Sequence, residues 1–200
     1  SGLQFYDGMT STEIQSILIK SAADLISLDS PNYQYVAARL LLFQIRKSVF
    51  NTKWKDSKIY PPLKDIVTRN INYDVYDDSL ITYYSDEEWD KIDSYMKHDR
   101  DMLFTYAGLR QVVDKYLVQD RSSGKIFESP QYMYMLIAAV LFKNYPKDKR
   151  LSYVKRYYEA VSTFKINIPT PIMAGIRTPL RQFASCVLVD SDDSLDSIFS

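Results

Sequence analysis

One thiol and two neighbouring arginines, near the C-terminal end of the sequence, have the clearest chemical potential. Cys186 is the only cysteine, and Arg177 and Arg181 closely precede it. A thiol beside guanidinium groups ionises more readily, and the thiolate is the reactive form. A lone thiol cannot complete a dithiol couple, so a redox role requires a second cysteine from outside the chain. The alternative is a buried cysteine that packs as a small hydrophobic residue.

Hydroxyl and carboxylate side chains lie on both sides of Cys186. Thr170 and Ser185 occur in or beside proline-containing turns, where hydroxyls and backbone N–H groups can hold phosphate oxygens. The same residue types are common in turns that bind nothing. The acidic run that follows could bind a metal or a ribose hydroxyl, or simply cap a helix. This run comprises Asp190, Asp192, Asp193 and Asp196.

The only histidine, His98, lies in the charged sequence KHDRD at residues 97–101. A general base needs a nucleophile or a substrate beside it, and the sequence has no nucleophile motif of the G-x-S-x-G type. We therefore expect His98 to belong to a charged, hydrogen-bonded helix end. One cysteine and one histidine are also too few ligands for a usual zinc cluster.

Length and composition indicate a packed domain. The sequence has 200 residues, of which 46% are hydrophobic, and its formal net charge is zero. These values favour one domain, or one domain plus part of another, and they argue against a general nucleic-acid or membrane-surface binder. The longest apolar run, residues 132–142, is about half of the ~20 residues that a membrane span needs. A single cysteine excludes an internal disulfide and favours a reducing, cytosolic setting.

The elements that position these side chains are predicted to be mainly helices through residue 160. Helix starts are indicated by capping boxes and by serine–proline pairs. The four starts are Thr10 with Glu13, Ser30-Pro31, Ser85 with Glu88, and Ser129-Pro130. The last of these opens the most apolar helix, which we expect to be central. Apolar residues at helical spacing predict the buried faces, namely Ile14, Ile17, Leu18 and Leu25; Val36, Leu40 and Phe43; Trp89, Ile92 and Met96; and Leu151, Val154, Tyr158 and Val161.

Two regions predict β-structure. Residues 122–124, Ser-Ser-Gly between two β-prone runs, predict a hairpin. After residue 162, the alternation of Phe164, Ile166 and Ile168 is typical of a strand, and the prolines and Gly175 that follow favour ordered loop over helix.

The end of the sequence has a different pattern. FASCVLV, residues 183–189, is a continuous apolar run that predicts a strand buried on both faces of a parallel sheet. DSDDSLDSI, residues 190–198, offers several N-caps for a new helix. A strand, an acidic turn and a helix start indicate the first unit of an α/β domain.

Residues 153–198, YVKRYYEAVSTFKINIPTPIMAGIRTPLRQFASCVLVDSDDSLDSI, resemble the large (alpha) subunit of class I ribonucleotide reductases of bacterial and phage type. The stretches NYQYVAARLL, HDRDMLFTYAG and KYLVQDRSSGKIFESPQYMYM match the same family, so the resemblance covers nearly the whole chain. It implies reduction of ribonucleoside diphosphates to 2′-deoxyribonucleoside diphosphates by thiyl-radical chemistry, for DNA precursor synthesis.

The resemblance also implies a fold. The family's alpha subunit has an N-terminal ATP-binding cone, a helical domain and a ten-stranded α/β barrel. The expected fold class is therefore mainly α, with a helical domain carrying one β-hairpin over residues 1–162. A loop, the first barrel strand and the start of the following helix are expected over residues 163–200, with the cone absent and the barrel truncated.

The resemblance assigns roles to individual residues. It implies that Cys186 is the redox-active cysteine of the first barrel strand, with its disulfide partner outside the chain. It implies that Thr170 binds the substrate phosphate and that Ser185 contacts the substrate. The segment after the strand is implied to contribute to the site for a deoxynucleoside triphosphate effector; it comprises Asp193, Ser194 and Leu195.

Partners and cofactors follow from the same resemblance. The family's alpha subunits form homodimers, receive a radical from a di-iron beta subunit, respond to dNTP and ATP effectors, and are reduced by thioredoxin or glutaredoxin. We expect no metal or cofactor bound directly in this chain, no nucleic-acid or membrane partner, and a cytoplasmic location (the host cytoplasm for a phage protein). Because the radical-site cysteine and the partner cysteine are missing, the 200-residue piece alone is expected to be inactive. The alternative is a non-catalytic helical interaction module with a buried structural cysteine.

Overall fold

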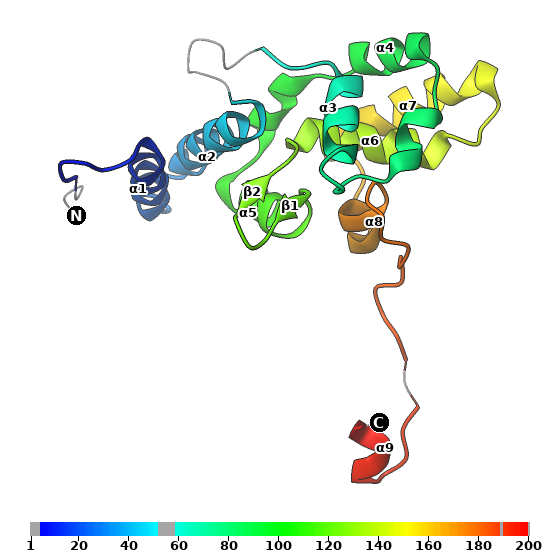
Figure 1. The fold of residues 1–200 in the computed structure, drawn as a ribbon. Coiled ribbons are helices and arrows are strands. Elements are labelled where there is room, and N and C mark those ends of the chain that lie inside the picture. The colour runs from blue at the N-terminus through cyan, green and yellow to red at the C-terminus, as the bar shows by residue number, and fades with distance from the viewer. Residues whose placement is uncertain (1–4, 52–58, 189, 200) are drawn as a thin grey trace.

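The computed structural model describes residues 5–51, 59–188 and 190–199, and this part of the chain is mainly helical (Figure 1). The helices are α1 (Ser11–Asp24), α2 (Tyr33–Phe50), α3 (Leu63–Ile71), α4 (Asp86–Ser94), α5 (Tyr106–Lys115), α6 (Pro130–Phe142), α7 (Lys147–Ser162), α8 (Thr170–Gly175) and α9 (Leu195–Phe199), with 3-10 helices η2 (Asp78–Thr82) and η3 (His98–Leu103). The mainly α fold class is confirmed. Within the described ranges, no helix combines the length and the apolar character that crossing a membrane requires.

Both predicted capping boxes are confirmed. The hydroxyl of Thr10 accepts the N–H of Glu13 at the start of α1, and the Glu13 carboxylate accepts the N–H of Thr10 in return. Ser85 and Glu88 make the same reciprocal pair at the start of α4. Each pair satisfies backbone donors that the first turn of a helix leaves without an intrahelical partner.

The predicted start of α2 is displaced along the chain. We expected Ser30 as the N-cap and Pro31 as the first helical residue, but the helix begins at Tyr33 with Asn32 at the N-cap position. The N–H of Tyr33 bonds the carbonyl of Ser30, so the chain completes a turn before it becomes helical.

The predicted buried faces of α1 and α2 were partly wrong. Val36 is 43% exposed and Leu40 is half-buried, whereas Ala37 and Ala38 are buried. Leu25 follows the end of α1 and is exposed. The two helices pack mainly on each other, and α2 also packs on α5. A prediction based on large apolar residues alone does not include the buried alanines of α2.

The most apolar helix, α6, is the centre of the fold as expected. All residues of α6 from Pro130 to Val140 are buried, which is typical of a helix that is hydrophobic on every side. It packs against α7, η3 and α8, and in Figure 1 it lies between α3 and α7. The predicted faces of α4 and α7 are also confirmed, since Trp89, Ile92, Val154 and Tyr158 are buried.

The predicted hairpin is present and is short. Strand β1 (Gln119–Asp120) pairs antiparallel with β2 (Lys125–Ile126). Gly124 has φ of +71° in the connecting turn, a backbone conformation that glycine adopts without strain.

Residues 163–175 differ from the prediction. Phe164, Ile166 and Ile168 form no strand, and Phe164 has φ of +60°. The segment expected as loop is helix α8, with Pro169 at the N-cap position and Pro171 in the first turn. Proline is well suited to the first turn of a helix because N–H groups there make no intrahelical hydrogen bond, so the N–H that proline lacks is not needed.

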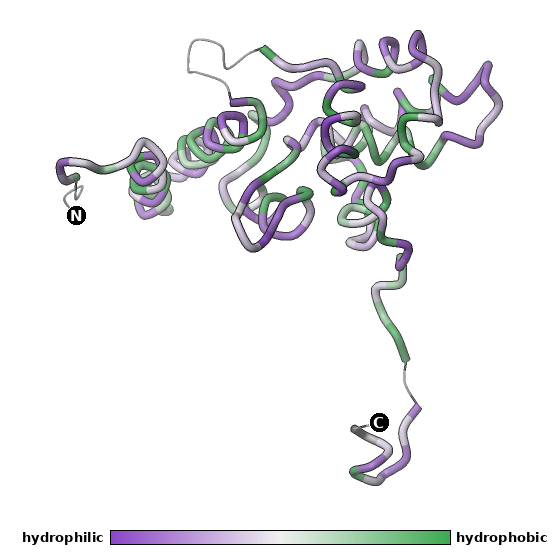
Figure 2. The backbone as a smooth tube through the Cα atoms, in the orientation of Figure 1, coloured by the Kyte–Doolittle hydropathy of each residue, from purple (hydrophilic) through white to green (hydrophobic). Residues whose placement is uncertain are grey.

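Residues 183–188 form no strand and are not buried. They run as an exposed extended segment that descends from α8 to α9, away from the helices (Figure 1). Figure 2 shows this segment as a hydrophobic stretch outside the body. A buried strand needs neighbouring strands for its N–H and C=O groups, and the sheet in the described residues consists of β1 and β2 alone. Val189, the last residue of the predicted strand, lies outside the described residues.

Candidate functional site

Thr170, the predicted phosphate ligand, is the first residue of α8 and is exposed. Its hydroxyl lies 3.4 Å from the hydroxyl of Tyr116, the residue that follows α5. The hydroxyl of Thr170 is therefore available at the surface and is contacted from one side by a second polar group.

A groove of about 530 Å³ runs beside this contact. Its walls come from η3, α5, α6 and the segment that leads into α8. Tyr116, Ile168 and Met173 are among the lining residues, with Phe104 and Phe164 in edge-to-face contact at 4.9 Å between ring centroids. The groove is mainly apolar, and Tyr116 places its polar end next to Thr170.

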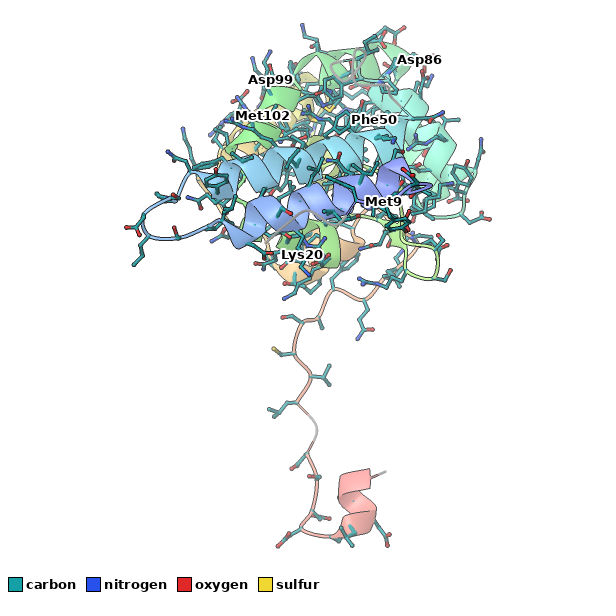
Figure 3. All side chains as sticks on the ribbon, turned by 90° about the vertical axis from the view of Figure 1, so that its left-hand side faces the viewer. Met9, Lys20, Phe50, Asp86, Asp99 and Met102 are labelled. Carbon is teal, nitrogen blue, oxygen red and sulfur yellow. The ribbon has the colours of Figure 1, made fainter. Side chains whose placement is uncertain are left out.

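Ser185 and Cys186 are both exposed on the extended segment. The hydroxyl of Ser185 is directed at the sulfur of Cys186, with 3.9 Å between the two atoms. Figure 3 shows the side chains of this segment projecting to both sides of the extended chain, below the helical body. The alternative in which Cys186 is a buried structural cysteine is therefore wrong for this structure.

The three predicted effector-site residues lie at the start of α9. Asp193 and Ser194 are exposed, and Leu195 begins the helix. The hydroxyl of Ser194 accepts the N–H of Ser197 at 3.2 Å, the usual geometry of an N-cap. This part of the acidic run therefore has a capping role whether or not it also binds a ligand.

The structure does not gather the predicted residues into one cavity. Ser185 and Cys186 are adjacent, but within the described ranges no hydrogen bond connects them to Thr170. Arg177 and Arg181 would favour the thiolate of Cys186 if they lay near it, but both form salt bridges elsewhere. Arg177 forms a salt bridge with Glu128 in the interior, and Arg181 forms one with Asp77.

The pairing of Arg177 with Glu128 was missed by sequence reasoning. Both side chains are fully buried, and Glu128 directly precedes the N-cap of α6. Nothing in the local sequence identifies a buried arginine, because arginine is usually exposed. The two partners are also 49 residues apart in the sequence, so no local pattern could indicate that they are in contact.

A second buried polar cluster surrounds η3. The ring of His98 stacks on Tyr60 with 3.7 Å between centroids and 8° between planes. Burial, together with the nearby charge of Arg46, lowers the pKa of His98 to about 4, so the imidazole is neutral at neutral pH. The helix end carries charged groups as expected, and Arg46 donates to the carbonyl of His98, but the imidazole itself is uncharged and packs on aromatic rings.

Asp101 is the acidic member of the same cluster and is 1% exposed. Burial raises its pKa to about 7, because the charged carboxylate loses its hydration. Its Oδ1 accepts the side-chain N–H of Gln131 at 2.8 Å, and its Oδ2 lies 3.7 Å from the guanidinium of Arg46. Gln131 in turn accepts the hydroxyl of Tyr158 at 2.7 Å. The cluster therefore links α2, η3, α6 and α7.

In the part of the chain that the structure describes, no three His, Cys, Asp or Glu side chains are grouped so that they could hold a metal ion. Some polar groups in the described interior are paired, as in Arg177 with Glu128, whereas the hydroxyls of Tyr60 and Ser129 and the Nδ1 of His98 are buried without a hydrogen-bond partner. The arrangement as a whole is a helical body with an exposed hydroxyl at Thr170, from which a thiol-bearing segment emerges.

Comparison with known proteins identifies this arrangement. The ribonucleotide reductase all-alpha domain matches residues 102–181. The chain is 52% identical over 199 residues to the ribonucleoside-diphosphate reductase 1 subunit alpha of Escherichia coli and 53% identical over 199 residues to the subunit alpha of Haemophilus influenzae. It is 50% identical over 192 residues to the subunit alpha of enterobacteria phage T4.

These alignments cover 99%, 99% and 96% of this chain. They cover 25%, 26% and 25% of the relatives, so the chain spans about a quarter of their length. The match includes the helical body, the segment with Cys186 and most of the acidic run. The chain therefore belongs to the family of ribonucleoside-diphosphate reductase alpha subunits, and its residues 102–181 match that family's all-alpha domain.

Proposed function

We propose that this chain supplies one wall of the substrate site of a ribonucleoside-diphosphate reductase, with Cys186 as one of two thiols that reduce the ribose. The observation that carries the proposal is the exposed thiol of Cys186 beside Ser185, on a segment that leaves the all-alpha domain. Relatives that share about half of their aligned residues with this chain are named as reductases of ribonucleoside diphosphates.

The chemistry explains why a thiol belongs at this position. Replacing the 2′-hydroxyl of a ribonucleotide by hydrogen releases water and takes up two electrons and two protons. Two thiols supply both and are left as a disulfide. Cys186 provides one thiol. Because it is the only cysteine of this sequence, the second thiol must come from a cysteine outside it. Thioredoxin or glutaredoxin would then reduce the disulfide by thiol–disulfide exchange.

Thr170 and Ser185 have positioning roles in this proposal. The exposed hydroxyl of Thr170 donates a hydrogen bond to a phosphate oxygen of the diphosphate, and Ser185 contacts the substrate next to the thiol. Fixing the phosphate end restricts the position of the ribose relative to the thiol. Such positioning accounts for a large share of the rate acceleration of enzymes.

The remaining parts of the proposal concern the assembly. The apolar residues 183–188, which form no strand here, would form the first strand of a ten-stranded α/β barrel, and the barrel would bury the faces that are exposed here. Asp193, Ser194 and Leu195 contribute to an effector site for a deoxynucleoside triphosphate between two alpha subunits. A beta subunit with a di-iron centre supplies the radical, and the enzyme acts in the cytoplasm.

A hybrid subunit tests the proposal. The matching quarter of the Escherichia coli relative is replaced by this chain, and the formation of deoxynucleoside diphosphate is measured with the beta subunit and a dithiol reductant. Turnover is expected for the hybrid, and the isolated 200-residue chain is expected to produce no deoxynucleotide. In the hybrid, C186S should abolish turnover, and T170A should raise KM for the diphosphate.

The matched control is S122A, which removes a hydroxyl from the turn of the hairpin. It should leave both kcat and KM unchanged. A hybrid that turns over at the same rate with serine at position 186 would contradict the role of the thiol. An unchanged KM for T170A would contradict the role of the threonine.

A further inference from the structure

An arginine at the end of α8 is completely removed from solvent. Arg177 and Glu128 are each 0% exposed, and Tyr76 beside them is 2% exposed. Removing two charges from water is unfavourable unless their geometry and hydrogen bonds compensate for it. A buried pair of this kind therefore requires a structural or functional reason beyond general stability.

The guanidinium of Arg177 bonds three separate parts of the fold. Its Nε lies 2.8 Å and 3.0 Å from the two carboxylate oxygens of Glu128. One terminal nitrogen donates to the carbonyl of Met173 in α8 at 2.6 Å, and the other donates to the carbonyl of Tyr116 at 2.8 Å. A planar cation with donors on several sides can make such a set of contacts, whereas an ammonium group of similar charge cannot.

Glu128 is held in turn by neighbours other than Arg177. The N–H of Val118 donates to one carboxylate oxygen at 2.8 Å, and the hydroxyl of Tyr76 donates to the other. Burial alone would lower the pKa of Arg177, but the charge of Glu128 and its hydrogen bonds raise it above the usual value. The guanidinium therefore stays protonated, and its hydrogen bonds stay in place over the whole physiological pH range.

Two of the three contacts lead to Thr170. Met173 belongs to the six-residue helix that begins at Thr170, and the hydroxyl of Tyr116 is the group 3.4 Å from the Thr170 hydroxyl. A helix of this length is unstable by itself, so its position depends on contacts with the body. Arg177 thus fixes both the helix that carries Thr170 and the residue that contacts its hydroxyl.

We propose that Arg177 is a positioning residue, which sets the location of the Thr170 hydroxyl through α8 and through Tyr116. This inference rests on the proposed role of Thr170 in binding the substrate phosphate. Arg177 touches no substrate in this proposal. Its contribution is to hold the Thr170 hydroxyl, which binds the substrate phosphate, in one position before the substrate binds.

Hydrogen exchange of the chain itself tests the first step. In R177K the backbone amides of Met173 and Ile176 should exchange at least tenfold faster, while those of α4 keep their rates. The matched control is R150K, which changes another arginine–glutamate pair, between the buried Arg150 of α7 and the half-buried Glu88. It should leave α8 unchanged. Equal acceleration of all helices in R177K would overturn the proposal, because Arg177 would then only stabilise the whole fold.

Steady-state kinetics of the hybrid subunit test the second step. R177K should raise KM for the ribonucleoside diphosphate about tenfold, with kcat changed less than about twofold, because the misplaced ligand weakens binding and leaves the thiols intact. R150K should leave KM unchanged. A loss of kcat at constant KM, as expected for a smaller folded fraction, would overturn the proposal.

Two further variants keep the outcomes separate. Y116F removes only the hydroxyl beside Thr170, so it remains informative if R177K does not fold, and a KM equal to that of the unsubstituted hybrid would overturn the inference. If T170A leaves KM unchanged, the proposed function of Thr170 fails. If T170A raises KM while R177K and Y116F do not, the proposed function stands and only the positioning role of Arg177 fails.

Discussion

His98 and Asp101 should make the stability of this protein depend on pH in opposite directions. Both side chains lie on η3, against Arg46 of α2, Tyr60, and Gln131 of α6. We consider H98F, which keeps a flat ring beside Tyr60, and D101N, which keeps the shape of the carboxyl group. Each variant removes one titration and leaves the other.

The sign for Asp101 follows from its raised pKa. Its pKa is about 7 in the folded chain and 3.8 in the reference state, so between these values the folded state holds a proton that the unfolded state has lost. The free energy of unfolding that depends on this proton is fully present below pH 3.8 and is lost as the pH rises towards 7. The stability contributed by Asp101 therefore falls with increasing pH.

His98 has the opposite sign because its pKa is lowered. Its pKa is about 4 in the folded chain and 6.5 in the reference state. Between these values the unfolded state binds the extra proton, so the contribution of His98 to the free energy of unfolding rises with pH. In the unsubstituted chain the two contributions nearly cancel between pH 4.5 and pH 6.5.

The magnitude follows from the width of this window. When a group is protonated in the folded or the unfolded state but not in both, each pH unit changes the free energy of unfolding by about 1.4 kcal/mol. From pH 4.5 to pH 6.5, D101N should therefore gain up to about 3 kcal/mol relative to the unsubstituted chain, and H98F should lose a similar amount. Titrations elsewhere in the chain are common to all variants and disappear from the differences.

The assay is urea unfolding followed by circular dichroism at pH 4.5, 5.5 and 6.5. S16A is the control, because the hydroxyl of the exposed Ser16 bonds the carbonyl of Thr12 on α1 and its loss removes no titratable group; its difference from the unsubstituted chain should not vary with pH. If D101N and H98F shift with the same sign, or if neither difference varies with pH, the account of the cluster around η3 is wrong.

Three further predictions concern single contacts. Replacing the cap residue in T10A or S85A should lower the free energy of unfolding by about 1 kcal/mol each in urea titrations, and a loss below the error of the method would contradict the role of the capping boxes. G124A should lower the free energy of unfolding by about 1 kcal/mol in the same assay because φ is +71° there. The added methyl group itself would have no atom within 4 Å. Cys186 should react with a thiol reagent in native buffer nearly as fast as in urea, and protection until unfolding would show that the sulfur is covered.

The sequence predicted most of the helices, for reasons that are local. Thr10 with Glu13, and Ser85 with Glu88, satisfy the first backbone donors of their helices without help from distant residues. The continuous apolar sequence of α6 can only be accommodated in the interior. Such features depend on neighbours within one or two turns.

The sequence failed where distant residues decide. The proline-containing segment from Thr170 to Gly175 is helical because α6 and the side chain of Arg177 hold it. The apolar residues 183–188 were predicted as a strand, but strand formation depends on partners that the described residues do not include. Residue types alone drew attention to Thr170, Ser185 and Cys186, but their roles came from family resemblance and stay predictions.

The contacts of residues 177–181 also determine when this protein can finish folding. Arg177 meets Glu128 across 49 residues of sequence, and Arg181 meets Asp77 across 104. Contacts between such distant residues form slowly because a long loop must close first. Since synthesis on the ribosome delivers Arg177 long after Tyr76 and Glu128, a growing chain leaves that carboxylate in water until α8 emerges. The buried ion pair of Arg177 and Glu128 thus forms only after residue 177 has been synthesised.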